Sequence, residues 1–218
     1  MEVTLLPMGR DAVLVEVGGT EEVLVLADAL RPGRPEGPPW ARTVTEVVPA
    51  ARTLLLRVAG PADLPAVREG LVALAAALDA PADLDAATRH APEDAVVVPV
   101  TYDGADLAEV ARLTGLDEDE VVRAHTGSTW RVGFIGFAPG FAYLVGGDER
   151  LHVPRRDTPR TAVPAGSVGL AGEFGGIYPR SSPGGWQLVG RTDAPLWDVD
   201  RDPPALLRPG ATVRFEEV

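Results

Sequence analysis

Between residues 136 and 192 the chain reads GFAPGFAYL (136–144), VPRRDTPRTAVPAGSVGLAG (153–172) and GGIYPRSSPGGWQLVGRT (175–192). Thirteen of the chain's 24 glycines lie between Gly133 and Gly190. A flexible linker would share this Gly and Pro content, but it would lack the aromatic residues and the short β-type runs. Tight turns between short strands expose backbone amides to ligands, so we expect the functional site in this segment.

Composition limits the chemistry that the chain can perform. The 218 residues include no cysteine, which excludes disulfides, thiolate nucleophiles and thiolate metal sites. They also include no lysine, which excludes Schiff-base chemistry and a phosphate-loop lysine. Any cation that binds an anionic ligand must be an arginine, whose planar guanidinium pairs well with carboxylates and phosphates.

Charge and hydropathy indicate which partners and which cellular location to expect for the protein. A net charge of −12 argues against nucleic acid, because binding to it requires phosphates to be neutralised. No apolar run reaches the roughly 18 residues that a membrane span needs. The amino terminus lacks the basic start and small-residue cleavage site of a signal peptide. We therefore expect a cytoplasmic protein.

Hydrophobic periodicity predicts an α+β fold with two domains. Residues 1–85 are expected to form a small α+β domain, ferredoxin-like in outline. Its expected elements are strands at 3–6, 12–17, 43–48 and 54–58 and helices at 21–30 and 64–78. The polar stretch Pro81–Glu93 is the expected boundary, and a second domain is expected over residues 95–218. Because titratable residues do not cluster in the first domain, we expect it to be structural or to serve in docking.

Residues 106–125 have the outline of a helix-turn-helix, with Gly115 in the turn. The second helix opens with Asp117, Glu118, Asp119 and Glu120, which would face phosphates in a DNA groove. Acidic residues in the first turn are instead favoured by the helix dipole. His125 lies at the end of this helix. It is either a proton shuttle active near neutral pH or a partner of the helix carboxyl end.

Residues 153–160 contain three arginines, Arg155, Arg156 and Arg160, together with two prolines. Because proline stiffens the loop, Arg155 and Arg160 could hold a carboxylate or phosphate at little entropic cost. The alternative is a solvated loop whose charge Asp157 partly neutralises. Ser167 lacks the flanking pattern of a nucleophile elbow, so its hydroxyl is expected to bond a ligand or a turn. Trp186 follows two glycines and suits either a binding wall or a packing anchor.

Three ordered motifs carry a family resemblance. They are FxPGFxYL (137–144), PRxxTPRxxVPAGSVGxAG (154–172) and GIYPxxSPGGWxLxGRT (176–192), with VVRAHT (121–126) upstream and LLRPGATVRF (206–215) at the end. In these segments the chain resembles the 5-oxoprolinase B-subunit family, also called allophanate hydrolase subunit 1. That family includes KipI-type kinase inhibitors. The resemblance covers essentially the whole chain and is strongest from about residue 98 onward.

The resemblance implies a cyclophilin-like β-barrel after the amino-terminal domain, and activity within a complex. The complex would contain two further subunits, a KipA-like one (C) with a lactam-hydrolase-like one (A). It would hydrolyse 5-oxo-L-proline, a small anionic substrate, to L-glutamate with ATP and Mg²⁺. We expect no metal site in this chain and no ATP bound by it alone. The alternative implied by the resemblance is a regulatory protein that binds and inhibits a sensor histidine kinase. A third reading, peptidyl-prolyl isomerase activity, would rest on the barrel alone.

The resemblance in these motifs also implies which residues form the site. His125 is the catalytic candidate. The substrate-binding candidates are Phe137, Pro139, Gly140, Arg155, Arg160, Pro164, Gly166, Ser167, Tyr178, Gly184, Gly185 and Trp186. One departure falls between these motifs: Phe174 and Gly175 stand where the family usually has Gln and Thr. The loss of two polar side chains there points to a change in ligand contacts.

Overall fold

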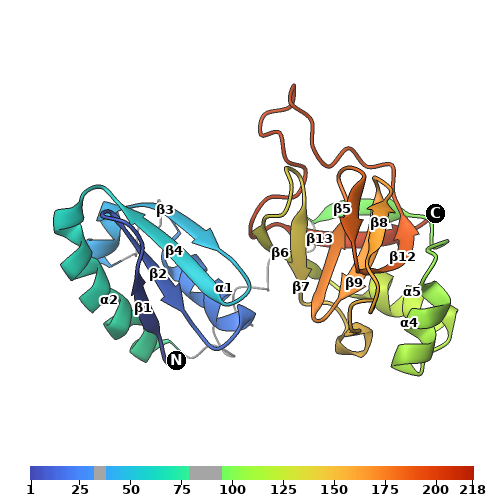
Figure 1. The fold of residues 1–218 in the computed structure, drawn as a ribbon, viewed down its shortest axis with the longest axis horizontal. Helices are drawn as coiled ribbons and strands as arrows, with labels where there is room; N and C mark the ends of the chain where they lie inside the picture. The colour runs from blue at the N-terminus through green and yellow to red at the C-terminus, as the bar shows by residue number, and fades with distance from the viewer. Residues whose placement is uncertain (32–37, 79–94) are drawn as a thin grey trace. The chain divides into compact units, whose positions relative to one another are not determined.

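The chain folds into two compact units, Met1–Arg89 and His90–Val218, in a computed structural model that describes residues 1–31, 38–78 and 95–218 (Figure 1). Each unit has its own hydrophobic core. The expected boundary, Pro81–Glu93, lies outside the described residues. The described helices include none that is long and apolar enough to cross a membrane.

The first unit is a four-stranded antiparallel sheet with two helices. Its elements are β1 (Thr4–Pro7), β2 (Ala12–Glu16), α1 (Thr20–Ala29), β3 (Val44–Pro49), β4 (Thr53–Val58) and α2 (Leu64–Ala77), with short 3-10 turns η1 (Pro39–Thr43) and η2 (Pro61–Asp63). The strand order is β1-β2-β4-β3. Strand β4 lies between β2 and β3, which α1 connects, and this is the split arrangement of a ferredoxin-like sandwich. The fourth strand position is filled by β1 from the amino terminus.

Alternation along the strands places one face of this sheet against the helices. Val13 and Val15 of β2 and Leu54 and Leu56 of β4 are fully buried. They pack with apolar residues of α1 and α2 in one cluster. Burial of such side chains contributes roughly 1.5–3 kcal/mol each, so this face holds the unit together.

The second unit is a β-barrel. Its strands are β5 (Val96–Val100), β6 (Trp130–Ile135), β7 (Ala142–Val145), β9 (Ser167–Ala171), β10 (Phe174–Ile177), β12 (Gln187–Arg191) and β13 (Thr212–Glu217). They form one sheet in the order β12-β9-β10-β7-β6-β13-β5. Thr101, next to β5, exchanges two 2.9 Å backbone hydrogen bonds with Arg191 of β12. These bonds join the two edges of the sheet, so the expected barrel and the α+β class are confirmed.

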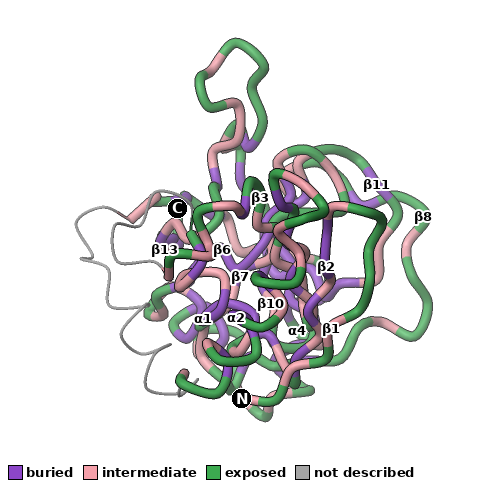
Figure 2. Tube along the Cα trace, turned by 90° about the vertical axis from the view of Figure 1, so that its left-hand side faces the viewer, coloured by how far each residue is buried: buried purple, intermediate pink, exposed green. Residues whose placement is uncertain are grey.

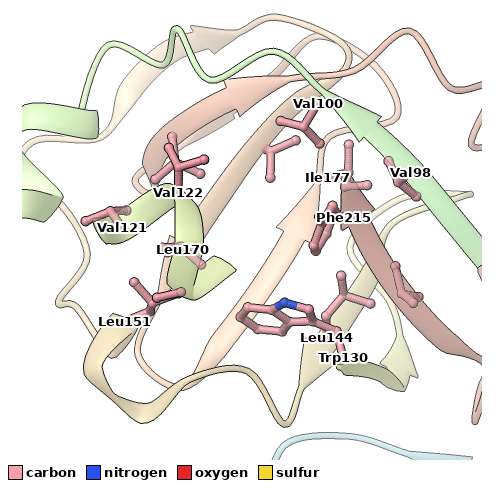
Figure 3. Packing of buried hydrophobic residues seen from close by; sticks show 14 of the residues in the cluster. Val98, Val100, Val121, Val122, Trp130, Leu144, Leu151, Leu170, Ile177 and Phe215 are labelled. Carbon is pink, nitrogen blue, oxygen red and sulfur yellow. The ribbon is translucent and has the colours of Figure 1, made fainter. Parts of the chain in front are cut away.

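Large side chains fill the barrel interior, among them Trp130 of β6 and Phe215 of β13 (Figure 3). Glycine makes room for the indole. A Cβ atom added to Gly175 would lie 2.9 Å from the Trp130 ring, and one added to Gly147 would collide with it. Gly175 is half of the pair that departs from the family pattern. Its lack of a side chain therefore has a packing reason inside the barrel.

Two helices, α4 (Leu107–Thr114) and α5 (Glu118–Gly127), contact the barrel at β12 and β13. Gly115 ends α4 with a φ of 74°, which glycine adopts without strain. The Asp117 carboxylate then accepts a 2.6 Å hydrogen bond from the Glu120 amide, and the Glu120 side chain accepts one from the Asp117 amide. This capping box accounts for the acidic first turn.

Three further features lie outside the seven-stranded sheet. Strands β8 (Arg160–Val163) and β11 (Ser182–Gly184) form a separate two-stranded ribbon, and η4 (Glu149–Leu151) is a short 3-10 turn. Between β12 and β13 the chain makes an excursion that projects from the barrel unit (dark orange in Figure 1). Figure 2 shows that most of this excursion, at the top of the view, is exposed.

Candidate functional site

The turn-rich segment gathers four aromatic rings on one side of the barrel unit. The Tyr178 ring, just after β10, lies 5.5 Å from Phe141, 6.2 Å from Phe137 and 6.4 Å from Trp186, measured between ring centroids. All three pairs are edge-to-face, a geometry worth about 0.5–1.5 kcal/mol per pair beyond burial. Tyr178 and Trp186 are buried, whereas Phe137 is 57% exposed. We call these four residues the aromatic wall.

The turn between β6 and β7 presents the exposed end of this wall. Phe137 has a φ of 63°, and among the described residues it is the one non-glycine residue with a positive φ. That conformation costs roughly 1–2 kcal/mol for a residue with a Cβ atom. Pro139 is exposed, and Gly140 follows with a φ of 83°. A Cβ atom on Gly140 would lie 2.9 Å from the Cβ atom of Trp197, so glycine permits this close approach.

Glycines on β11 and after it bring backbone against the aromatic wall. A Cβ atom on Gly184 would collide with the Tyr178 hydroxyl. The Gly185 carbonyl accepts a 2.8 Å hydrogen bond from the Arg156 amide, which ties the arginine-rich loop to this turn. Burial raises the pKa of Tyr178, although the positive charge of Arg155 and the Trp186 backbone act in the opposite direction. The Tyr178 hydroxyl is therefore protonated at neutral pH.

The turn that begins at Pro164 lies beside the backbone of Tyr178. The Gly166 amide donates to the Tyr178 carbonyl at 2.7 Å, and the Tyr178 amide donates to the Ser167 carbonyl at 2.9 Å. Ser167 itself is buried at the start of β9. Within the described chain no His or carboxylate side chain hydrogen-bonds its hydroxyl. The arrangement therefore lacks the base that a serine nucleophile needs.

Two arginines of this region converge on an internal carboxylate. One oxygen of Asp106 accepts hydrogen bonds from Arg156 at 2.6 Å and from Arg160 at 2.8 Å. The other oxygen accepts a 2.7 Å bond from the Leu188 amide on β12. Asp106 is 2% exposed, whereas the side chains of Arg156 and Arg160 are 34% and 22% exposed. The group links the arginine-rich loop to the start of α4 and to the barrel.

Burial alone would raise the pKa of Asp106. The hydrogen bonds from Arg160 and the Leu188 amide, with the charges of both arginines, outweigh burial and hold that pKa below its ordinary value. Asp106 is thus ionised at neutral pH. Asp157 was the counter-ion expected from the sequence in the solvated-loop alternative, but among the described ion pairs Asp106 is the partner of Arg156 and Arg160.

Arg155 differs from its two neighbours. Its side chain is exposed and forms no ion pair within the described residues. Its positive charge acts to lower the pKa of Tyr178, a member of the aromatic wall. Of the arginines predicted to hold an anion, Arg155 is therefore available, whereas Arg160 is already paired with Asp106.

His125 lies apart from this group, in the barrel core. It is fully buried, its ring centroid is 4.2 Å from that of Phe215, and its Nδ1 is 2.7 Å from the Tyr102 hydroxyl. Burial lowers the pKa of His125 to about 3, so the ring is neutral at pH 7. A buried neutral ring fits neither a proton shuttle open to substrate nor a charged partner of the helix dipole. Its catalytic role stays a prediction that this placement does not favour.

The described residues offer few other groups that could bind a metal ion or perform catalysis. They contain no group of three His, Asp or Glu side chains that could hold a metal ion. A shallow depression of about 320 Å³ lies between α5 and η4, and none of the predicted site residues lines it. The gathered residues can thus supply aromatic surface, one free guanidinium and backbone donors, but no nucleophile with its base.

Sequence reasoning missed Asp106. In the sequence it looks like the first residue of a helix, and its arginine partners follow 50 and 54 positions later. A local signal was present, because an aspartate before a helix usually caps it. Here the carboxylate makes no capping bond and points to Leu188 and the arginines instead.

Comparisons with known proteins agree with the resemblance in the motifs. Residues 3–207 match the family described as carboxyltransferase domain, subdomain C and D. The B subunits of 5-oxoprolinase from Escherichia coli O157:H7 and Bacillus subtilis are 53% and 46% identical over 55% and 56% of this chain. These matches span 56% and 52% of the two relatives, about half of their length.

A solved structure matches over a longer range. A conserved uncharacterized protein from Pyrococcus horikoshii is 34% identical, with a TM-score of 0.56, over 99% of this chain and 97% of that protein. This match covers both units, and the matched protein is described as uncharacterized. Because the family match spans most of the sequence, the chain belongs to the family of the carboxyltransferase domain, subdomain C and D.

Proposed function

We propose that this chain is the B subunit of an ATP-dependent 5-oxoprolinase complex and forms one wall of its substrate site. Relatives named as B subunits of 5-oxoprolinase support the assignment. The observation that carries it is the aromatic wall with its exposed Phe137, built from the same turn-rich motifs that carry the exposed, unpaired Arg155. A wall of this kind can bind and orient a small anion but cannot hydrolyse it alone.

The chemistry of 5-oxo-L-proline matches these groups. Its carboxylate suits the guanidinium of Arg155, which forms stronger hydrogen bonds to an ionised acceptor than to a neutral one. Its small, partly apolar ring suits the exposed face of Phe137. We assign to this chain the binding and orientation of substrate.

ATP with Mg²⁺ would activate the lactam oxygen, a step that requires cations around the transferred phosphate. The described residues do not fit that group, because they offer neither a lysine nor a cluster of carboxylates. We therefore assign the nucleotide and the attacking water to the lactam-hydrolase-like and KipA-like partners. Isolated, this chain is expected to be inactive.

The test is reconstitution with both partners, followed by measurement of 5-oxoproline-dependent phosphate release and glutamate formation. Replacing Arg155 by Ala should raise the KM for 5-oxoproline at least about tenfold, the loss expected for a charged hydrogen bond to substrate. Arg123→Ala, which removes an exposed guanidinium from α5, is the matched control and should leave KM unchanged. If the complete complex hydrolyses neither ATP nor 5-oxoproline, the proposal is wrong.

A further inference from the structure

Asp106 is fixed to strand β12 through both its backbone and its side chain. The Asp106 amide donates to the Leu188 carbonyl at 2.9 Å, and the Leu188 amide donates to Oδ2 of Asp106 at 2.7 Å. A Cβ atom on Gly104 would collide with the Leu188 carbonyl oxygen, so glycine permits this close approach of the two segments. The Asp106 carboxylate therefore has a fixed position on the barrel.

The second oxygen of this carboxylate holds the arginine-rich loop at two points. Oδ1 of Asp106 accepts from Nη1 of Arg156 at 2.6 Å and from Nη2 of Arg160 at 2.8 Å. Both bonds join ionised groups, and such bonds are roughly twice as strong as those between neutral groups. The loop segment between the two arginines is thus bound to β12 at each of its ends.

Hydrogen bonds on either side of Arg155 bind the loop to the turn that contains Trp186. The Arg156 amide donates to the Gly185 carbonyl at 2.8 Å, and Nε2 of Gln187 donates to the Pro154 carbonyl at 3.2 Å. Because the neighbours of Arg155 are bound to the neighbours of Trp186, the Arg155 backbone runs beside that of Trp186. Trp186 belongs to the aromatic wall, and the Arg155 side chain is exposed.

We propose that Asp106 is a positioning residue for substrate, which holds the loop so that the exposed Arg155 stays beside the aromatic wall. This inference rests on the proposed function, because it takes Arg155 to bind the carboxylate of 5-oxo-L-proline. Asp106 is 2% exposed and does not contact the substrate itself. A loop that is already fixed loses less conformational entropy when it binds, and a displacement of about 1 Å can cost a site about a hundredfold.

The test uses the complex reconstituted with both partners. Asp106→Asn should raise the KM for 5-oxoproline at least about tenfold, with the KM for ATP unchanged and kcat within about twofold. A purely structural loss would reduce the amount of folded enzyme, which lowers the apparent kcat and leaves KM unchanged. Asp148→Asn, which breaks a 2.6 Å ion pair with Arg150, is the matched control and should not change the KM for 5-oxoproline.

A double variant shows whether Asp106 acts through Arg155. Asp106→Asn/Arg155→Ala should have the same KM as Arg155→Ala alone, because the guanidinium that Asp106 positions is already absent. Independent roles would multiply the two fold-changes. Arg156→Gln serves if Asp106→Asn fails to fold, because it leaves Asp106 bound to Arg160 and Leu188; it should raise the KM for 5-oxoproline at least about threefold.

The outcomes separate this inference from the proposed function. If Arg155→Ala raises KM while Asp106→Asn stays within about twofold of the wild type, the positioning role is wrong and the proposed function stands. The same conclusion follows if the two fold-changes multiply in the double variant. If the wild-type complex hydrolyses neither ATP nor 5-oxoproline, both fail.

Discussion

Replacing His125 by Gln should remove a large part of the acid sensitivity of this protein. The imidazole is fully buried between Phe215, 4.2 Å away, and Trp130, 5.2 Å away, measured between ring centroids. Its Nε2 has no hydrogen-bond partner within the described residues. Protonation would put a cation in this apolar core, so the folded state keeps the ring neutral.

The expected magnitude follows from the two pKa values. Burial lowers the pKa of folded His125 to about 3, whereas an unfolded histidine has a pKa of about 6.5. Between these values the unfolded chain binds one more proton than the folded chain, so the free energy of unfolding decreases as pH falls. The loss begins near pH 6.5 and ends near pH 3. At about pH 5 His125 alone should have reduced the stability by about 2 kcal/mol.

Urea unfolding followed by tryptophan fluorescence measures this loss. The stability difference between about pH 7.5 and about pH 5 should be about 2 kcal/mol smaller for His125→Gln than for the wild type. Other acid-sensitive groups contribute to both proteins and cancel in the comparison. His152→Gln, at an exposed position, is the matched control. Equal pH dependence in the wild type and His125→Gln would refute the reasoning.

Two substitutions at the candidate site test its construction. Asp106→Asn leaves two partly buried guanidinium groups without their anion and should reduce the free energy of unfolding by about 3 kcal/mol; Glu109→Gln, which breaks an exposed ion pair with Arg112, should change it within error. Gly184→Ala forces a methyl group against the Tyr178 hydroxyl and should cost about 1–3 kcal/mol. Gly127→Ala, where a methyl group would meet no atom within 4 Å, should be neutral, and chemical denaturation measures all four.

Local signals were enough to predict most of the elements. The helix that begins near Asp117 has an acidic first turn and a glycine before it, and the structure contains both the capping box and the Gly115 turn. The order of the strands in the barrel has no such local signal. Strand β13 pairs in parallel with β5, joining Val213 to Val96 across more than a hundred residues. Only the packing of the whole unit determines that pairing.

The candidate site was likewise predicted in part from local sequence signals. Density of turns predicted the region in which Phe137, Tyr178 and Trp186 meet, because tight turns bring short strands and their aromatic residues together. The pairing of Asp106 with the arginines was not predicted, because an ion pair between distant segments leaves no periodicity in the sequence. The sequence showed that Gly175 differs from the family pattern. Only the structure shows that a side chain at this position would press against the Trp130 ring.

The Asp106 group decides how many cations the candidate site can offer to an anion. Any anion that reached Arg160 would have to displace a buried carboxylate held by three hydrogen bonds, which would leave that carboxylate buried without its partners. That cost makes Arg160 a support for the loop and leaves Arg155 as the exposed cation of this loop. One guanidinium can bind a carboxylate, but it cannot also neutralise a transferred phosphate. If the proposed function holds, the second positive charge comes from a partner subunit.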